Sequence, residues 1–362
     1  MATRQTPRPV DLDNVPEVRR AIAGRGLGLL QPETVHSFRG RNDNWSGRTT
    51  NGAQVFVKKI EGPEARQRFS RTLFFEGLHR TDRVPVPAPR CLGWDEPSAI
   101  VIYELLGGAR SAAELADDGA FTEQLAREAG AMVGRLHSML VDSPELHRKP
   151  RSWPLLEDHE AVSAAAYAGA SGALLEFWGL FQRDPMLAAA IDLLRDRAVQ
   201  APHTPVHGDL RLDQFLCPAD GLRMIDWEEF RCADPAQDIG SFIGEWVCRA
   251  MVAGAADSTA NGDTLMHSWA REMDRRMPYV RGFWDGYVCN RLAVDPELGL
   301  RTAGFTGWHV LDRVMAGCQE HHQLTALQKA QIGVARTLML DPGRFLQLTG
   351  IGTNSSSKES PA

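Results

Sequence analysis

A β-hairpin signal inside a helical region constrains the fold of this 362-residue chain more than any other feature. Residues 214–217 and 222–225 have strand-like composition, and Asp220 and Gly221 lie between them. An Asp-Gly pair is a strong signal for a tight turn between antiparallel strands. Helical periodicity dominates the flanking segments, as in residues 121–140, 161–181 and 186–199. The region is therefore predicted to be a helical domain with one embedded hairpin.

The N-terminal part of the chain has a different pattern. After a helix expected at 15–23, residues 38–60 predict a strand, a glycine-punctuated loop and a second strand. A helix is expected at about 64–80, and the β-branched apolar run at 99–106 is typical of a buried strand. We therefore predict an α+β fold with two lobes. Its parts are a small β-rich N-lobe at 1–105, a large, mainly helical C-lobe at 106–348 and a disordered polar tail at 349–362.

Composition argues against several classes of protein. The net charge of −6 does not suggest general affinity for nucleic acid or for anionic membranes. No apolar stretch approaches the roughly 18–20 residues that a membrane span requires, and the first twenty residues do not resemble a signal peptide. The six cysteines are scattered without a C-x-x-C pair, which favours reduced thiols. A cytoplasmic globular protein without nucleic-acid or membrane partners is expected.

The hairpin carries a distinctive set of polar residues at its two ends. A His207-Gly208-Asp209 loop leads into it, and Gln214 follows Asp209 by five positions. The second strand ends directly before Asp226. Because the turn at 220–221 folds the chain back on itself, the carboxylates of Asp209 and Asp226 are expected at the same mouth of the hairpin.

Two carboxylates and an amide in this arrangement suit the transfer of a phosphoryl group from ATP. The reaction needs Mg²⁺ on the phosphate oxygens and an oriented acceptor hydroxyl. Mg²⁺ prefers hard oxygen ligands, which Asp226 and Gln214 supply. Asp209 is the candidate catalytic base, since a carboxylate beside the hydroxyl orients it and accepts its proton. The sequence therefore predicts a Mg·ATP-dependent phosphotransferase.

A lysine and a glutamate of the N-lobe are a second candidate pair. Lys58 lies in a strand-like segment, and Glu76 follows Phe69 and Leu73 on one stripe of the next helix. A carboxylate that continues an apolar stripe points inward and needs a partner, because an unpaired buried charge is costly. We expect Lys58 to pair with Glu76 and to contact the α- and β-phosphates of ATP. The alternative is a solvated strand lysine and a surface glutamate.

These elements together resemble the aminoglycoside phosphotransferase-like branch of the protein-kinase fold, over about residues 35–245. Leu136-His137 and Asp234-Pro235 followed by Asp238 also match that branch. The resemblance implies that ATP binds between lobes, that adenine contacts the backbone near Glu104 and Leu105, and that His207 and Asp238 support the site. The branch normally has asparagine where this chain has Gln214, and residues 41–47 contain no G-x-G-x-x-G phosphate loop.

A closer resemblance narrows the expected substrate. The stretches FRGRNDNWSGRTTNGAQVFVKK, HGDLRLDQFL and IDWEEFRCADPAQDIGSFIGEW are similar to the kinase subunit of class V lanthionine synthetases. That family implies phosphorylation of Ser and Thr in a ribosomally made precursor peptide during lanthipeptide biosynthesis. It also implies a separate lyase partner that later eliminates the phosphate.

Other interpretations stay open at this stage. The chain could instead phosphorylate a small molecule such as an antibiotic, amino alcohol or sugar, or it could be a pseudokinase scaffold, which the glutamine at 214 makes conceivable. Glu228 and Glu229 could support the metal site or be surface charges. Arg66, Arg68 and Arg71 are expected on a solvated helix face rather than at a binding surface for an acidic leader peptide.

Overall fold

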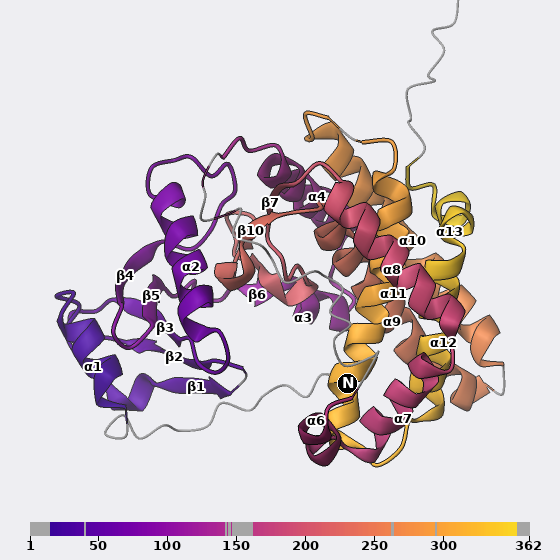
Figure 1. The fold of residues 1–362 in the computed structure, drawn as a ribbon. Helices are drawn as coiled ribbons and strands as arrows, with labels where there is room; N and C mark the ends of the chain where they lie inside the picture. The colour runs from indigo at the N-terminus through magenta and orange to yellow at the C-terminus, as the bar shows by residue number, and fades with distance from the viewer. Residues whose placement is uncertain are drawn as a thin grey trace, which may run out of the picture. The chain divides into compact units, whose positions relative to one another are not determined.

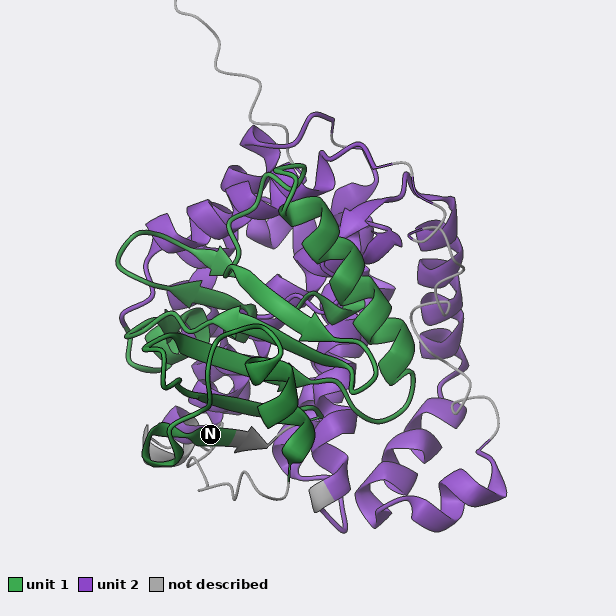
Figure 2. Ribbon diagram, turned by 90° about the vertical axis from the view of Figure 1, so that its left-hand side faces the viewer, with its two compact units in different colours: residues 1–119, 213–230 green, residues 120–212, 231–362 purple. Residues whose placement is uncertain are grey.

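The computed structural model describes residues 15–39, 41–141, 143, 146, 162–261, 264–293 and 295–352. Contacts divide the chain into two compact units, coloured separately in Figure 2. Unit 1 contains residues 1–119 and 213–230, and unit 2 contains residues 120–212 and 231–362. The hairpin groups with unit 1, although its position in the sequence predicted that it would belong to the helical lobe. The lobe boundaries at 105 and 348 stay a prediction.

Unit 1 is built on a five-stranded antiparallel sheet with strand order β1-β2-β3-β5-β4 (Figure 1). A second, three-stranded sheet has the order β6-β8-β9. The elements of the unit are α1 (Pro16–Ala23), η2 (Pro32–Thr34), β1 (His36–Arg39), β2 (Asp43–Arg48), β3 (Gln54–Lys59), α2 (Ala65–His79), β4 (Cys91–Asp95), β5 (Ile100–Glu104), β6 (Arg110–Ser111), α3 (Ala112–Asp117), β8 (Phe215–Cys217), β9 (Arg223–Met224) and η4 (Trp227–Glu229). The 3-10 turn η3 (Leu212–Gln214) joins the two units along the chain.

Side chains along β3 and β5 point alternately to the two faces of the larger sheet, and both faces are apolar. Val55, Val57, Ile100 and Ile102 pack with residues of α1 on one face. Val101 lies on the other face with Phe69 and Leu73 of α2. Because successive strand side chains point to opposite faces, one five-residue apolar run supplies both cores. The helices at 15–23 and 64–80 and the buried strand at 99–106 are thus confirmed within one or two residues.

The loop expected between the first two strands is instead largely a strand. β2 pairs with β1 on one side and with β3 on the other, and Trp45 faces the core at 3 % exposure. Asp, Asn and Gly have low strand propensity, which is why the segment resembled a loop. Pairing on both edges and burial of the indole ring outweigh that local preference.

Unit 2 is mainly helical, with α9, α10 and α11 side by side in Figure 1. Strands β7 and β10 form a short antiparallel pair. β7 comes before residues 213–230, which belong to unit 1, and β10 comes after them. The elements are α4 (Glu123–His137), α6 (Ala164–Gly169), α7 (Gly172–Gln182), α8 (Pro185–Gln200), β7 (Thr204–Val206), β10 (Arg231–Ala233), α9 (Ala236–Asn261), α10 (Leu265–Cys289), α11 (Leu298–Gly317), η5 (Cys318–Glu320), α12 (Ala326–Leu340) and α13 (Pro342–Thr349).

The α+β class expected from the sequence is confirmed, with a sheet-based unit and a helical unit. The hairpin is also confirmed, since β8 pairs antiparallel with β9. Within the described part of the chain, no helix has the length and apolar composition needed to cross a bilayer. From residue 353 onward the predicted disordered tail lies outside the described residues.

Helices α4 and α10 pack closely because glycine lies at their contact. A Cβ atom added at Gly130 would lie 1.9 Å from the carbonyl oxygen of Phe283. One added at Gly286 would lie 2.0 Å from the carbonyl oxygen of Arg127. Since both obstacles are backbone atoms, the helices would have to separate to admit a side chain at either position.

Replacing Gly130 with alanine is therefore expected to lower the free energy of unfolding by about 3 kcal/mol, near the upper end for overpacking. Urea or thermal unfolding measures the change. Gly333 is the matched control, because it lies at an exposed position of α12 with no atom within 4 Å of an added Cβ. Gly333→Ala is expected to stabilise the protein by up to about 1 kcal/mol. Destabilisation of the same size in both variants would contradict the close packing of α4 on α10.

Candidate active site

The hairpin holds Gln214 and Asp226 at the same end. Phe215 pairs with Met224, and the Ile225 N–H donates to the carbonyl oxygen of Gln214 at 3.0 Å. The chain reverses through Gly221, whose φ of +110° favours glycine. Asp226 is the next residue after Ile225, so it lies at the same end of the hairpin as Gln214.

Asp226 has an unusual backbone conformation for a residue with a side chain. Its φ of 71° and ψ of 55° lie in the left-handed region, and it begins the short helix η4. Non-glycine residues adopt this conformation rarely, and such positions concentrate at functional sites. The Asp226 carboxylate contacts the ammonium group of Lys58.

Lys58 lies between two carboxylates. Besides Asp226, its Nζ atom contacts Oε2 of Glu228 at 2.9 Å. Burial by itself would lower the pKa of Lys58, but the charges of Asp226 and Glu228 outweigh that effect and raise it. The lysine is thus held as a cation among the residues that follow the hairpin.

The expected pairing of Lys58 with Glu76 is wrong. Glu76 is buried as predicted, at 1 % exposure, but the ammonium group of Lys58 pairs with Asp226 and Glu228 instead. The electrostatic neighbours of Glu76 are Tyr103 and Arg80. Tyr103 is the strand partner of Phe56, which lies two positions before Lys58 on β3. The hairpin brings competing carboxylates that local periodicity cannot reveal.

Burial raises the pKa of Glu76 to about 7, although Tyr103 and Arg80 act in the opposite direction. A carboxyl whose pKa rises on folding binds protons more tightly in the native state. Its contribution to stability is therefore present below the unfolded pKa and is lost as pH rises through about 7.

We therefore expect Glu76→Gln to stabilise the protein at pH 8, by up to about 3 kcal/mol relative to wild type, with little difference at pH 4. The variant removes a buried charge at pH 8 but replaces an already neutral group at pH 4. Urea unfolding at both pH values measures the difference. An equal effect of the substitution at the two pH values would contradict the raised pKa of Glu76.

Two residues on separate segments hold Glu228. Oε1 of Glu228 accepts from Nη1 of Arg68 at 3.0 Å, and Oε2 accepts from Nδ2 of Asn42 at 2.7 Å. Arg68 is fully buried, so its expected position on a solvated helix face is wrong. Glu229 instead pairs with Arg71 at 2.8 Å and with Arg41 at 3.5 Å.

Sequence reasoning missed Arg68 and Asn42 and left the role of Glu228 open. One signal could have found Arg68: it lies four residues before Thr72 and seven before Phe75, both buried on α2. Nothing comparable marks Asn42, which directly precedes β2. Its role depends on contacts with segments far away in the sequence.

Asp238 organises the His-Gly-Asp loop in unit 2. Its carboxylate accepts from the N–H groups of His207 at 2.7 Å and Gly208 at 2.9 Å. His137 Nε2 lies 3.0 Å from the same carboxylate, while His137 Nδ1 lies 3.2 Å from the Tyr287 hydroxyl. The structure thus places the two predicted supporting residues, His207 and Asp238, in one buried cluster with His137.

The electrostatics of this cluster favour an ionised Asp238. Burial alone would raise the pKa of Asp238, but the hydrogen bond and charge of His137, the charge of His207 and the Gly208 N–H together lower it. Burial lowers the pKa of His137 despite its carboxylate partner. A carboxylate that accepts several N–H groups is a rigid anchor for a loop.

Asp209 extends from the anchored loop toward solvent. Its side chain is 45 % exposed, and Oδ2 lies 3.5 Å from Nη2 of Arg211. The Asp209 N–H donates to Nδ1 of the buried His207 at 3.3 Å. An accessible carboxylate on a fixed backbone suits a general base. Asp209 belongs to unit 2 and Asp226 to unit 1, so the expected meeting of their carboxylates stays a prediction.

Glu104 and Leu105 lie at and just beyond the end of β5, where adenine contacts were expected. The Leu105 N–H donates to the Gln54 carbonyl oxygen at 3.0 Å, and the Glu104 N–H donates to that of Arg90 at 3.0 Å. Both amides are thus engaged within unit 1. An adenine at this segment would have to contact other backbone groups.

The oxygen ligands that Asp226 and Gln214 can supply at the hairpin fit a magnesium ion. Asp226 already faces a cation, the Lys58 ammonium, and the backbone of Gln214 is held at the same end of the hairpin by the Ile225 N–H. Among the described residues, no group of three or more His, Cys, Asp or Glu side chains gathers as a metal cage. Mg²⁺ typically takes one or two carboxylates and completes its shell with phosphate and water.

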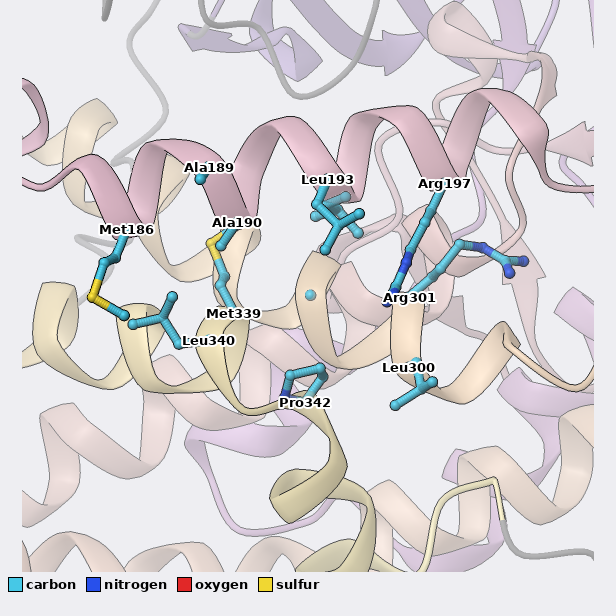
Figure 3. Close-up of a pocket in the computed structure, with 12 residues that line it drawn as sticks. Met186, Ala189, Ala190, Leu193, Arg197, Leu300, Arg301, Met339, Leu340 and Pro342 are labelled. Carbon is cyan, nitrogen blue, oxygen red and sulfur yellow. The ribbon is translucent and has the colours of Figure 1, made fainter.

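A separate pocket of about 470 Å³ lies among helices of unit 2 (Figure 3). Apolar side chains such as Met186, Leu193 and Leu340 line it, and Arg197 and Arg301 lie at one end. Arg301 also binds Asp234 at 2.7 Å. The pocket contains none of the site residues predicted from the sequence.

Solved kinase structures share this fold. The amicoumacin kinase hAmiN in complex with AMP-PNP, Ca²⁺ and Ami is 13% identical, with 92% of this chain and 94% of that chain covered and a TM-score of 0.55. The choline kinase LicA from Streptococcus pneumoniae is 14% identical, with 90% and 98% covered and a TM-score of 0.54. The macrolide 2'-phosphotransferase MphH from Brachybacterium faecium is 15% identical, with 90% and 98% covered and a TM-score of 0.51.

These similarities confirm the protein-kinase-like fold expected from the sequence. No curated protein sequence matches the chain. Residues 35–279, more than half of the chain, match the family model described as the phosphotransferase enzyme family. Together with the anchored loop and the hairpin, this match shows that the chain belongs to the phosphotransferase enzyme family.

Proposed function

We propose that the chain transfers the γ-phosphoryl group of Mg·ATP to the Ser and Thr hydroxyls of a ribosomal precursor peptide during lanthipeptide biosynthesis. The observation that carries phosphoryl transfer is the Asp238-anchored loop, which presents Asp209 and leads directly into the hairpin that holds Gln214 and Asp226. The peptide acceptor is supported by the resemblance to the kinase subunit of class V lanthionine synthetases. A separate lyase is the proposed partner.

Each residue has a defined task in this proposal. Asp209 orients the acceptor hydroxyl and takes its proton as the new oxygen–phosphorus bond forms. Asp226 and Gln214 would hold Mg²⁺, which neutralises charge on the phosphates when bound. Lys58 contributes a fixed positive charge for the α- and β-phosphates, which requires its ammonium to be shared with or released from Asp226.

A small-molecule alcohol is the second candidate acceptor. The solved structures with this fold include an amicoumacin kinase and choline kinases, whose acceptors are small molecules by their names. These similarities, at 13–14% identity, concern the fold and leave the acceptor to experiment.

Mass spectrometry distinguishes the two acceptors. The protein is incubated with ATP, Mg²⁺ and a Ser/Thr-rich precursor peptide encoded beside its gene, in parallel with choline and an aminoglycoside. Peptide phosphorylation adds mass in steps of about 80 Da, the mass of one phosphoryl group. A peptide variant without Ser and Thr is the control and should gain none. Phosphate on a small alcohol but never on the peptide would replace the first proposal with the second.

A further inference from the structure

Lys58 has two candidate partners for holding it in place, and the structure distinguishes them. The ammonium lies 2.9 Å from Glu228, whose side chain is 8 % exposed. Glu76 is also buried, but its electrostatic neighbours are Tyr103 and Arg80, and Lys58 is not among them. The glutamate that follows the hairpin thus occupies the position expected for the helix glutamate.

Glu228 is itself fixed by a closed set of hydrogen bonds. Nη1 of Arg68 donates both to Glu228 Oε1 at 3.0 Å and to Asn42 Oδ1 at 3.1 Å. Asn42 Nδ2 donates to Glu228 Oε2 at 2.7 Å, which completes a triangle. All three side chains are buried. Buried hydrogen bonds that link three side chains in this way restrict each of them to one orientation.

The triangle ties separate segments to Lys58. Arg68 comes from α2, and its Nη2 also donates to the Glu61 carbonyl oxygen. Asn42 precedes β2 and accepts from the Glu61 N–H at 3.3 Å. Glu228 comes from η4, more than 150 residues later. The chain therefore fixes Lys58 through a scaffold that does not include Glu76.

Charge supports the same assignment. Lys58 and Arg68 carry two positive charges, and Asp226 and Glu228 carry two negative charges, in one cluster. If Asp226 turns toward a magnesium ion, Glu228 remains as a carboxylate partner for Lys58. A lysine with a permanent second anchor can keep its position while the aspartate changes partner.

We propose that Glu228, held by Arg68 and Asn42, is the positioning residue that orients Lys58 toward the phosphates of the nucleotide. This role rests on the proposed function, since it presupposes that Lys58 binds nucleotide. Glu228 acts through Lys58 and contacts no reacting atom itself.

Glu228→Gln tests this role, because it keeps the size of the side chain and removes its charge. We expect kcat/KM for ATP to fall on the order of 100-fold, as for a misplaced catalytic group. Calorimetry with AMP-PNP and Mg²⁺ should show weaker binding, and this readout needs no acceptor. Glu228→Asp, which restores the charge, is expected to recover at least tenfold of the loss in kcat/KM.

Two further glutamate variants make the comparison specific. Glu229→Gln removes the adjacent charge, whose partners are Arg71 and Arg41, and is expected to change kcat/KM by no more than about threefold. Glu76→Gln tests the rival partner, and its loss should be at least tenfold smaller than that of Glu228→Gln. A loss in Glu76→Gln equal to or larger than that in Glu228→Gln would overturn the proposal.

The same variants distinguish a loss of stability, a failure of the positioning role and a failure of the proposed function. Thermal unfolding is measured for each variant; if Glu228→Gln does not fold, Asn42→Ala, which removes one of the two groups that hold Glu228, is compared with Glu76→Gln and must show the larger loss in AMP-PNP binding. Wild-type protein that binds nucleotide but phosphorylates no acceptor would refute the proposed function. Unchanged nucleotide binding in folded Glu228→Gln would refute only the positioning role.

Discussion

Replacement of Asp209 by alanine is expected to lower kcat for phosphoryl transfer by about 10²–10⁴-fold, the range that general base catalysis contributes. The side chain is nearly half-exposed, so its loss should change the free energy of unfolding by less than about 0.5 kcal/mol. The nucleotide should still bind, because the proposed phosphate contacts come from other residues. Turnover, AMP-PNP affinity and urea unfolding are measured on the same preparation.

Asp213→Ala is the matched control for this experiment. Asp213 lies four positions later, in the 3-10 turn η3, and is exposed, so turnover should stay within about threefold of wild type. If product formation in cells is unaffected by Asp209→Ala, chemistry does not take place at this loop. That result would favour the interpretation as a pseudokinase scaffold.

Replacement of Asp238 by alanine is expected to affect stability far more than replacement of Asp209. It leaves the N–H groups of His207 and Gly208 and one ring nitrogen of His137 without their acceptor in a buried site. Removing one member of such a buried charged cluster costs about 3–5 kcal/mol. Turnover should fall as well, because the backbone that presents Asp209 loses its anchor. Urea unfolding and steady-state kinetics measure the two effects.

Asp238→Asn separates the shape of this side chain from its charge. The pKa of Asp238 is lower in the folded protein than in the unfolded chain. The ionised carboxylate therefore stabilises the fold at pH values above the pKa of the unfolded chain, and this stabilisation is lost as the pH falls through the pKa of the folded protein. Wild type should therefore lose more stability than Asp238→Asn on acidification below about pH 4. Asp192→Ala, at a partly exposed pair with Arg195, is the control and should change stability by less than about 1 kcal/mol. Equal acid sensitivity of wild type and Asp238→Asn would contradict an ionised anchor.

Local patterns in the sequence were sufficient for the elements that carry the site. The Asp-Gly pair predicted the hairpin because few dipeptides adopt the required turn, and the structure confirms the pairing of β8 with β9. Periodicity predicted α2 and the burial of Glu76, since the apolar stripe of a helix depends only on spacing. The supporting roles of His207, in the loop, and of Asp238, in the first turn of α9, were predicted only from the resemblance to a known family.

Only the tertiary structure decided which buried charges meet. Lys58 could be recognised as a candidate site cation from its strand-like segment, but its carboxylate partners come from a segment about 170 positions away. The burial of Arg68 and the role of Asn42 depend on the same distant segment. Likewise, β2 forms against its local propensity because strands on both sides complete its hydrogen bonds. Turn and helix signals are local and can be recognised in sequence, whereas the partner of a buried charge is chosen by packing between remote segments.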